Sequence, residues 1–245
     1  MYFDGYFGFL AAILVCMLFS GFAGNKVKSA FAKHDRTRCR SGYSGYDTAS
    51  RLLWAGGVRG ISIGKVSGAL TDHYHPAKGI VNLSESTYGS RSVAAVAVAA
   101  HEVGHVMQRQ DGWLPYRLRT ALVPVVNIGS RLALPLVLVG LLLDGYSMAA
   151  DPEIGFKVAM FGVLLYGGSL LFALVTLPVE LNASRRAARM LTETGILTQE
   201  ELPAARKVLS AAAMTYLASL LTSMVYFLRF FTRVRFAFGR GNNRR

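Results

Sequence analysis

The chain has 245 residues and a formal net charge of +13; 52% of its residues are hydrophobic and 17% are charged. This composition is more apolar and less charged than that of an average soluble domain, and the apolar residues lie in long uncharged runs. Together these features exclude an ordinary soluble globular protein, and the presence of only two cysteines, Cys16 and Cys39, excludes a disulfide framework.

The first uncharged run, residues 5–24, is 20 residues long. As a helix it crosses a hydrocarbon core of about 30 Å. The preceding residues MYFD contain no Lys or Arg, and no clear A-x-A cleavage site follows the run. A signal peptide needs a basic segment before its apolar core. We therefore expect a retained membrane anchor.

Residues 25–120 are the only part long enough for a domain outside the membrane. Ser44 followed by Asp47 resembles a capping box, which predicts a helix that stops at the pair of glycines 56–57. Residues 61–84 alternate loosely in polarity around a turn at 76–79, which predicts a small antiparallel sheet whose last strand is about 79–84. We expect the next helix to begin at a cap of Ser90 or Ser92 and to end at Gly112.

Three further apolar runs follow. Residues 121–143 are interrupted only by Arg131, and residues 158–179 and 208–228 carry no charge. With the first run, they predict an integral membrane protein with about four hydrophobic helices, mainly α-helical, and a small α+β portion outside the bilayer.

The charged residues indicate the orientation of these spans. Six Lys or Arg residues follow the first span within 25–40, whereas the loop 144–153 has three acids and no base. The positive-inside rule then places 25–120 and 180–207 in the cytosol, and the N-terminus and the acidic loop outside. The net charge therefore reports orientation and does not predict a nucleic-acid partner, because no recognised nucleic-acid-binding fold accompanies it.

The end of the chain does not fit this count. A complete last span would place the tail 229–245, with six Arg, outside. Either the last hydrophobic helix is re-entrant or deeply packed, or the tail breaks the rule. The alternation of Arg and Phe in the tail is also typical of a segment on anionic lipid.

The stretch VAVAAHEVGHVMQRQ carries the clearest chemistry. Residues four apart on a helix differ by about 40° around its axis, so His101 and His105 can share one metal ion. Glu102 lies beside them and can accept a proton from water without binding the ion. This HExxH pattern is typical of zinc peptidases. The alternative is a core helix whose polar residues are satisfied by neighbours.

A catalytic zinc site usually has three protein ligands. Glu180 is the candidate for the third, because it ends the apolar run 158–179 and lies 75 residues after His105. Two consecutive membrane spans between these residues would place His105 and Glu180 on the same side of the membrane. The alternative is an interfacial glutamate paired with Arg185 or Arg186.

Other candidates lie nearby. His73 or Tyr74 could stabilise an oxyanion, although His73 could equally cap a turn. Asp72 could orient His73 or form an Asx-turn. Strand 79–84 could be an edge to which an extended substrate adds, and Asn182 could support the ligands.

These motifs carry a resemblance. HEVGH, the membrane hairpin, LPVELNASRRA and the last hydrophobic helix resemble the YugP-type family of bacterial membrane zinc metallopeptidases, and more distantly HtpX-type and prenyl-protein-processing proteases. The resemblance implies a gluzincin-like fold, endopeptidase activity and Glu180 as the third ligand. It also favours His73, through TDHY. Where the distant relatives have E-x-x-x-D, this chain has Ser184 in place of the Asp, which puts the support of the ligands in question.

The working hypothesis is a zinc endopeptidase in the plasma (inner) membrane, multi-pass, with its active site on the cytosolic side. Zn²⁺ would be bound by His101, His105 and Glu180, with Glu102 and His73 as catalytic residues and a membrane-associated protein or peptide as substrate. The alternative is a membrane scaffold or adaptor with a structural zinc site. The sequence indicates neither the substrate nor the oligomeric state.

Along the chain this hypothesis assigns five parts. They are an anchor (1–24), a zincin-like portion (25–120), a transmembrane hairpin (121–179), a third-ligand helix (180–207), and a hydrophobic helix with a basic tail (208–245).

Overall fold

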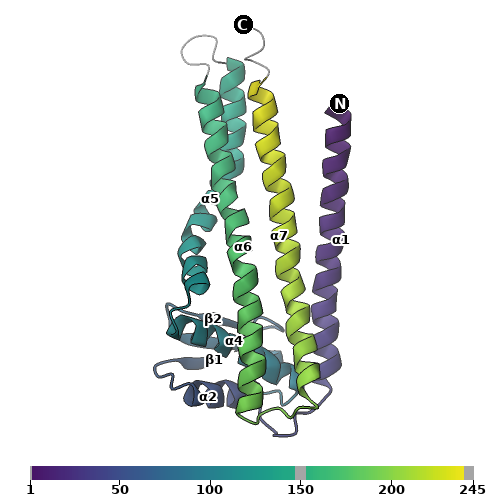
Figure 1. The fold of residues 1–245 in the computed structure, drawn as a ribbon, viewed down its shortest axis with the longest axis vertical. Helices are drawn as coiled ribbons and strands as arrows, with labels where there is room; N and C mark the ends of the chain where they lie inside the picture. The colour runs from purple at the N-terminus through teal and green to yellow at the C-terminus, as the bar shows by residue number, and fades with distance from the viewer. Residues whose placement is uncertain (1, 147–152, 240–245) are drawn as a thin grey trace. The chain divides into compact units, whose positions relative to one another are not determined.

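The computed structural model describes residues 2–146 and 153–239. Seven helices and three strands are found in these ranges (Figure 1). They are α1 (Tyr2–Asp35), α2 (Gly45–Ala55), β1 (Ser62–Val66), β2 (His73–His75), β3 (Ile80–Ser84), α3 (Glu85–Tyr88), α4 (Val93–Gln110), α5 (Leu114–Tyr146), α6 (Ile154–Glu193) and α7 (Leu202–Gly239). Most of the expected acidic loop, 147–152, lies outside the described residues.

The chain divides into two compact units, each built from segments distant in sequence. A membrane unit contains the described parts of 1–20, 118–176 and 217–245. A site unit contains 21–117 and 177–216. Helices α1, α6 and α7 extend beyond the apolar runs that they contain. Each of them contributes residues to both units.

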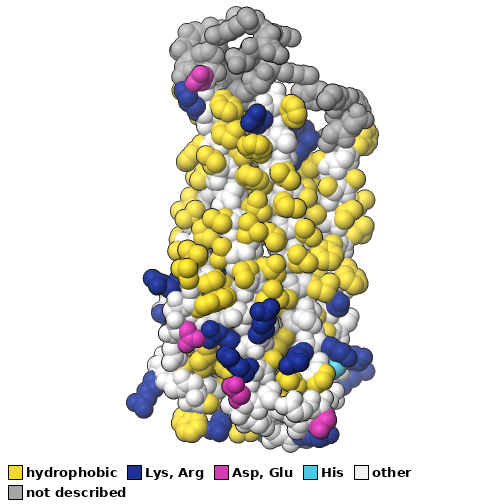
Figure 2. Space-filling model, in the orientation of Figure 1, with side chains coloured by type: hydrophobic (Ala, Val, Ile, Leu, Met, Phe, Trp, Pro, Cys, Tyr) yellow, Lys and Arg dark blue, Asp and Glu magenta, His cyan; other side chains and the backbone are white. Residues whose placement is uncertain are grey.

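The membrane unit confirms the prediction of a mainly helical membrane protein. Four helices are long and apolar enough to cross a bilayer, and hydrophobic side chains are widely exposed along them (Figure 2). Such exposure suits lipid as the surrounding solvent. Within the unit, α5 and α6 approach closely at Gly140 and Gly162, where an added Cβ would lie 2.4 Å from the nitrogen of Ala159 and 2.7 Å from the oxygen of Ala133. Small residues at helix contacts are common in membranes.

The first helix of the site unit after α1 forms where its cap predicts. The hydroxyl of Ser44 accepts the backbone N–H of Asp47, and the carboxylate of Asp47 accepts the backbone N–H of Ser44. These two bonds satisfy backbone donors that a helix start leaves without partners. The helix ends at Gly56, as expected, and buries Leu52 and Leu53 against α4.

The sheet differs from the prediction. β2 and β3 form the expected antiparallel hairpin, but β1 pairs with β3 in parallel, giving the order β1-β3-β2. The chain between β1 and β2 crosses to the end of β3, where Gly68 accepts the N–H of Glu85 and Leu70 donates to Ser86. This crossover, with Gly68 at φ 93°, places β1 on the far side of β3.

The expectation that strand 79–84 is an edge strand is therefore wrong. β3 has a hydrogen-bonded neighbour on both sides, so its backbone groups are used within the sheet. Periodicity in the sequence could not show this, because pairing order depends on where the connecting chain passes.

Helix α4 is the centre of the site unit. Ser92 is its N-cap, and its residues from 93 to 97 have no exposed surface. Gly104 faces α6 so closely that an added Cβ would lie 2.7 Å from the backbone oxygen of Ala183. A glycine in a helix costs about 1 kcal/mol relative to alanine, and here it permits direct backbone contact between α4 and α6.

The contact makes a test of packing possible. We expect Gly104→Ala to lower the melting temperature of the purified protein, because the methyl group must push two backbones apart, at a cost of about 1–3 kcal/mol that exceeds the gain in helix propensity. Gly89→Ala is the control, because an added Cβ at Gly89 meets nothing within 4 Å. An unchanged melting temperature for Gly104→Ala would show that the two helices can separate freely.

Candidate metal centre

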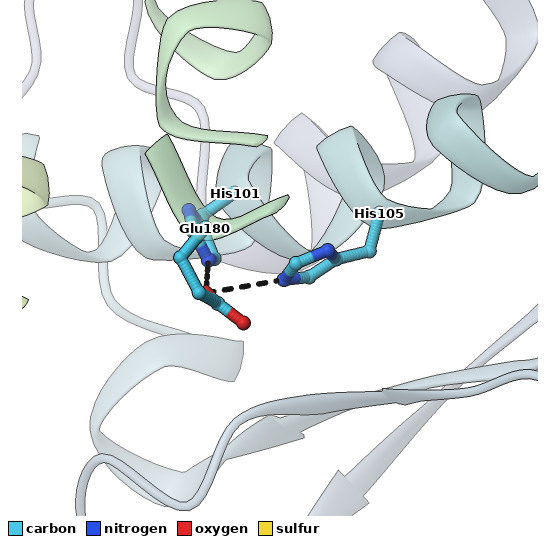
Figure 3. A group of neighbouring side chains, drawn as sticks. All are labelled: His101, His105 and Glu180. Atoms are coloured by element: carbon cyan, nitrogen blue, oxygen red, sulfur yellow. Dashed lines mark hydrogen bonds and ion pairs between the residues drawn. The ribbon is translucent and has the colours of Figure 1, made fainter. Parts of the chain in front are cut away.

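Two elements bring the predicted ligands together. His101 and His105 lie one turn apart on α4, and Glu180 extends from α6 between them (Figure 3). One oxygen of Glu180 lies 3.1 Å from Nε2 of His101 and 3.5 Å from Nε2 of His105. The ligand atoms of all three residues lie within 4.8 Å of one another. Residues 75 apart in sequence therefore form one cluster, as the sequence predicts.

The chemistry of this cluster fits zinc. Two imidazoles and one carboxylate are a donor set found in catalytic zinc sites, with bonds of about 2.0–2.2 Å. In tetrahedral geometry such bonds separate neighbouring ligand atoms by about 3.3 Å. The 3.1 and 3.5 Å separations lie on either side of that value. His105 and Glu180 are buried and His101 is partly buried, so an ion here would be partly shielded from water.

The Nδ1 atom of each imidazole, which faces away from Glu180, has a hydrogen-bond partner of its own. Nδ1 of His101 lies 3.2 Å from the hydroxyl of Ser184, and Nδ1 of His105 lies 3.0 Å from the side-chain oxygen of Gln108. When each Nδ1 carries the proton and donates to that oxygen, each Nε2 keeps a free lone pair toward Glu180. Partners of this kind fix the tautomer and orientation of a ligand histidine. Ser184 thus contacts a predicted ligand from the position that the resemblance singles out.

Gln108 also joins the two helices. Its amide donates to the backbone oxygen of Val179, 2.8 Å away, and to the side-chain oxygen of Asn182, 3.0 Å away. Gln108 is fully buried, so each bond is made where water cannot replace it. One side chain therefore fixes His105 on α4 and the backbone next to the glutamate on α6.

Of the arginines that follow Glu180, Arg186 pairs with another carboxylate. Arg186 donates to the side-chain oxygen of Asn182 at 2.8 Å and pairs with Asp111. The carboxylate of Glu180 faces the histidines instead. The alternative of an interfacial Glu180–Arg186 pair is therefore not what the structure shows, and Asn182 lies in the polar network behind the cluster.

Glu102 is buried on the same helix. Burial is the main cause that raises the pKa of its carboxyl to about 7, and the negative charge of Glu180 acts in the same direction. Proximity to His101 and a hydrogen bond from the backbone N–H of Tyr74 oppose the rise. A carboxyl with a pKa near neutrality can both accept and release a proton at physiological pH.

His73 lies outside the three-residue cluster. It is exposed on β2, with Nδ1 2.9 Å from the backbone oxygen of Thr71 and Nε2 3.0 Å from the amide nitrogen of Asn82. Its catalytic role stays a prediction, and it requires the ring to leave Asn82. Asp72 neither orients His73 nor caps the turn: its carboxylate accepts the N–H and the hydroxyl of Ser84, both at 2.8 Å.

Two further residues at the site were not found from the sequence. Gln108 lies one turn beyond His105, so helical spacing could have indicated it. Tyr116, at the start of α5, is buried with its ring centroid 6.2 Å from that of His105. No local pattern indicates Tyr116, because its position depends on how the chain turns after α4.

Removing the carboxylate tests the ligand set. We expect Glu180→Ala to lower zinc affinity by at least about a hundredfold, because the loss of a ligand exceeds the 10–100-fold effect of losing a supporting group. Metal content after dialysis against a graded chelator measures this. Glu85→Ala, which removes an exposed carboxylate, serves as the control. Equal zinc retention by Glu180→Ala and wild type would remove Glu180 from the set.

Replacing the buried amide tests the support of His105. We expect Gln108→Leu, which keeps the volume but loses all three hydrogen bonds, to weaken zinc binding about 10–100-fold. Gln110→Leu removes an exposed amide on the same helix and should bind zinc as wild type does. If both variants behave alike in competition with a chelator, Gln108 only fills space.

Comparisons with known proteins identify the family of this chain. A family model described as "Putative neutral zinc metallopeptidase" matches residues 9–235. The chain is 39% identical over 222 residues to "Putative membrane protease YugP" of Bacillus subtilis (strain 168), a match that covers 91% of this chain and 94% of that protein. No solved structure matches the chain. The chain therefore belongs to the YugP-type family of membrane zinc metallopeptidases.

Proposed function

We propose that this protein is a zinc-dependent endopeptidase that hydrolyses peptide bonds of membrane or membrane-adjacent proteins at the cytosolic face of the plasma membrane. One observation carries the proposal. The His101, His105 and Glu180 ligand atoms converge within 4.8 Å, while Glu102 is buried on the same helix and is not part of the group. A structural zinc site needs only ligands; a neighbouring buried carboxyl that is not a ligand supplies an acid–base group as well.

His101, His105 and Glu180 would hold the zinc, which when bound would supply the Lewis acidity that polarises a carbonyl and makes water more acidic. The protein's part is to keep Nε2 of each histidine free of protons. Ser184 and Gln108 can do this by accepting hydrogen bonds from Nδ1 of His101 and Nδ1 of His105, respectively. Because Gln108 is also bonded to the backbone at Val179, a shift of α6 relative to α4 would disturb the ligands and their support together.

Glu102 handles the proton in this mechanism. Its carboxylate accepts a proton from the attacking water as the water oxygen bonds to the carbonyl carbon, and it then delivers that proton to the leaving amine nitrogen. The pKa of about 7 suits both steps, because neither direction of transfer is strongly uphill near neutral pH. The backbone N–H of Tyr74 gives the carboxyl a fixed hydrogen-bond partner.

The cytosolic placement rests on charge. Six Lys or Arg residues lie in 25–40, between the first apolar run and α2, and Arg185, Arg186 and Arg189 follow the third. The positive-inside rule assigns both stretches to the cytosol. Since α5 and α6 are consecutive candidate spans, the chain that leaves after α4 returns to the same side at Glu180. A site at the membrane boundary favours substrates that are themselves in or near the bilayer.

A glutamine at position 102 distinguishes an enzyme from a scaffold with structural zinc. We expect Glu102→Gln to keep zinc but to lose cleavage by at least about a hundredfold, because the amide cannot accept the proton. Metal content and cleavage of a mixture of membrane proteins are measured on the same preparations, with Glu85→Gln as the control. If Glu102→Gln cleaves like wild type, the mechanism is wrong; if wild type binds zinc and cleaves nothing, the scaffold is favoured.

A further inference from the structure

A cavity of about 660 Å³ lies between α6 and α7 within the site unit. Figure 2 shows Lys and Arg side chains gathered over the ends of these helices that belong to this unit. The lining combines arginines with aliphatic and small polar residues. The residues that matter for its chemistry are Leu181, Ser184, Arg185, Arg189, Arg206 and Ala213.

The polarity of the cavity changes along its length. At one end of the lining, Leu181 closely follows the uncharged run 158–179 and Ala213 lies within the run 208–228. The arginines lie farther from these runs along both helices. The lining residues Ala188, Leu202 and Leu209 are buried, whereas Arg185, Arg189 and Arg206 are exposed. An occupant would thus meet hydrocarbon at one end and positive charge at the other.

The positive charge of the lining is only partly balanced by acidic side chains. Arg189 lies 3.9 Å from Glu193, the one carboxylate in the lining. Across residues 2–146 and 153–239, neither Arg185 nor Arg206 has a carboxylate within ion-pair distance. Guanidinium groups bind phosphate oxygens with two donors each, so arginines on two facing helices suit a phosphate group.

The cavity also borders a residue that contacts one of the predicted zinc ligands. Ser184 is part of its lining and is the residue whose hydroxyl lies 3.2 Å from Nδ1 of His101. An occupant would therefore lie next to a group that orients a predicted zinc ligand.

We propose that this cavity binds an anionic phospholipid, with its phosphate between Arg185, Arg189 and Arg206 and its acyl chains directed past Leu181 and Ala213. The gradient from charge to hydrocarbon matches that of a phospholipid. A basic pocket between membrane helices is a common headgroup site. An acidic peptide would contact the arginines but not the apolar end of the cavity. Free phosphate would fill only a small part of the cavity and would not contact its apolar lining. This site is separate from the proposed proteolytic chemistry and does not depend on it.

The test counts bound lipid. Full-length zinc-loaded protein is placed in nanodiscs of phosphatidylcholine with a minor fraction of phosphatidylglycerol, and native mass spectrometry measures which lipid is retained. We expect wild type to retain phosphatidylglycerol and Arg185→Gln/Arg206→Gln to retain at least about tenfold less, because two charge-assisted contacts are lost. Arg36→Gln/Arg38→Gln removes the same charge from exposed positions away from the cavity and should retain the lipid.

Two further measurements distinguish a phospholipid from a free phosphate ion as the ligand. Ala213→Phe fills the apolar end while leaving the arginines intact, so it should also lose phosphatidylglycerol. Inorganic phosphate added to wild type should not displace the lipid. Melting curves of each variant in phosphatidylcholine alone confirm that it is folded.

Three outcomes would overturn the proposal. Equal phosphatidylglycerol retention by the Arg185→Gln/Arg206→Gln and Arg36→Gln/Arg38→Gln variants would show that retention depends only on the net charge of the protein. Displacement by inorganic phosphate at low concentration would make the site one for a free anion. Displacement by a poly-glutamate peptide with unchanged retention in Ala213→Phe would make it a peptide site.

Discussion

The direct backbone contact between α4 and α6 at Gly104 and Ala183 is the constraint on which the metal centre depends. Gly104 lies between the two histidines, and Ala183 lies between Glu180 and Ser184. A side chain at the contact would move both groups apart at once. Because ligand atoms must come within about 3.3 Å of one another on a tetrahedral ion, the separation of the two helices sets whether they can bind zinc at all.

Hydrogen bonds in a dry interior then hold this arrangement in one geometry. Gln108 fixes the imidazole of His105 and the backbone at Val179, and Asn182 links Gln108 to Arg186. Unsatisfied polar groups are costly when buried, and rotating Gln108 would break its bonds to His105, Val179 and Asn182 at once. The burial that stabilises the network also raises the pKa of Glu102 to about 7. Burial therefore both stabilises the hydrogen bonds and shifts the pKa of the carboxyl that could transfer protons.

The membrane helices explain why the ligands are so far apart in sequence. Between His105 and Glu180 the chain passes through α5 and most of α6, both candidate spans. A hairpin of two spans returns to the side it left, so a distant residue can complete a site without a long loop. The same design leaves α6 and α7 side by side just beyond their apolar runs, where the arginine-lined cavity lies.

The membrane spans, the capped helices α2 and α4, and the pairing of His101 with His105 could be predicted from run length, cap residues and spacing on one helix. The place of Glu180 beside them could be predicted because two spans return the chain to the side it left. Tertiary structure alone decided the parallel pairing of β1, the central place of β3, the bonds of His73 to Thr71 and Asn82, and the positions of Gln108 and Tyr116 beside His105. These features depend on contacts between segments that are distant along the chain, and such contacts leave no periodic pattern in either segment.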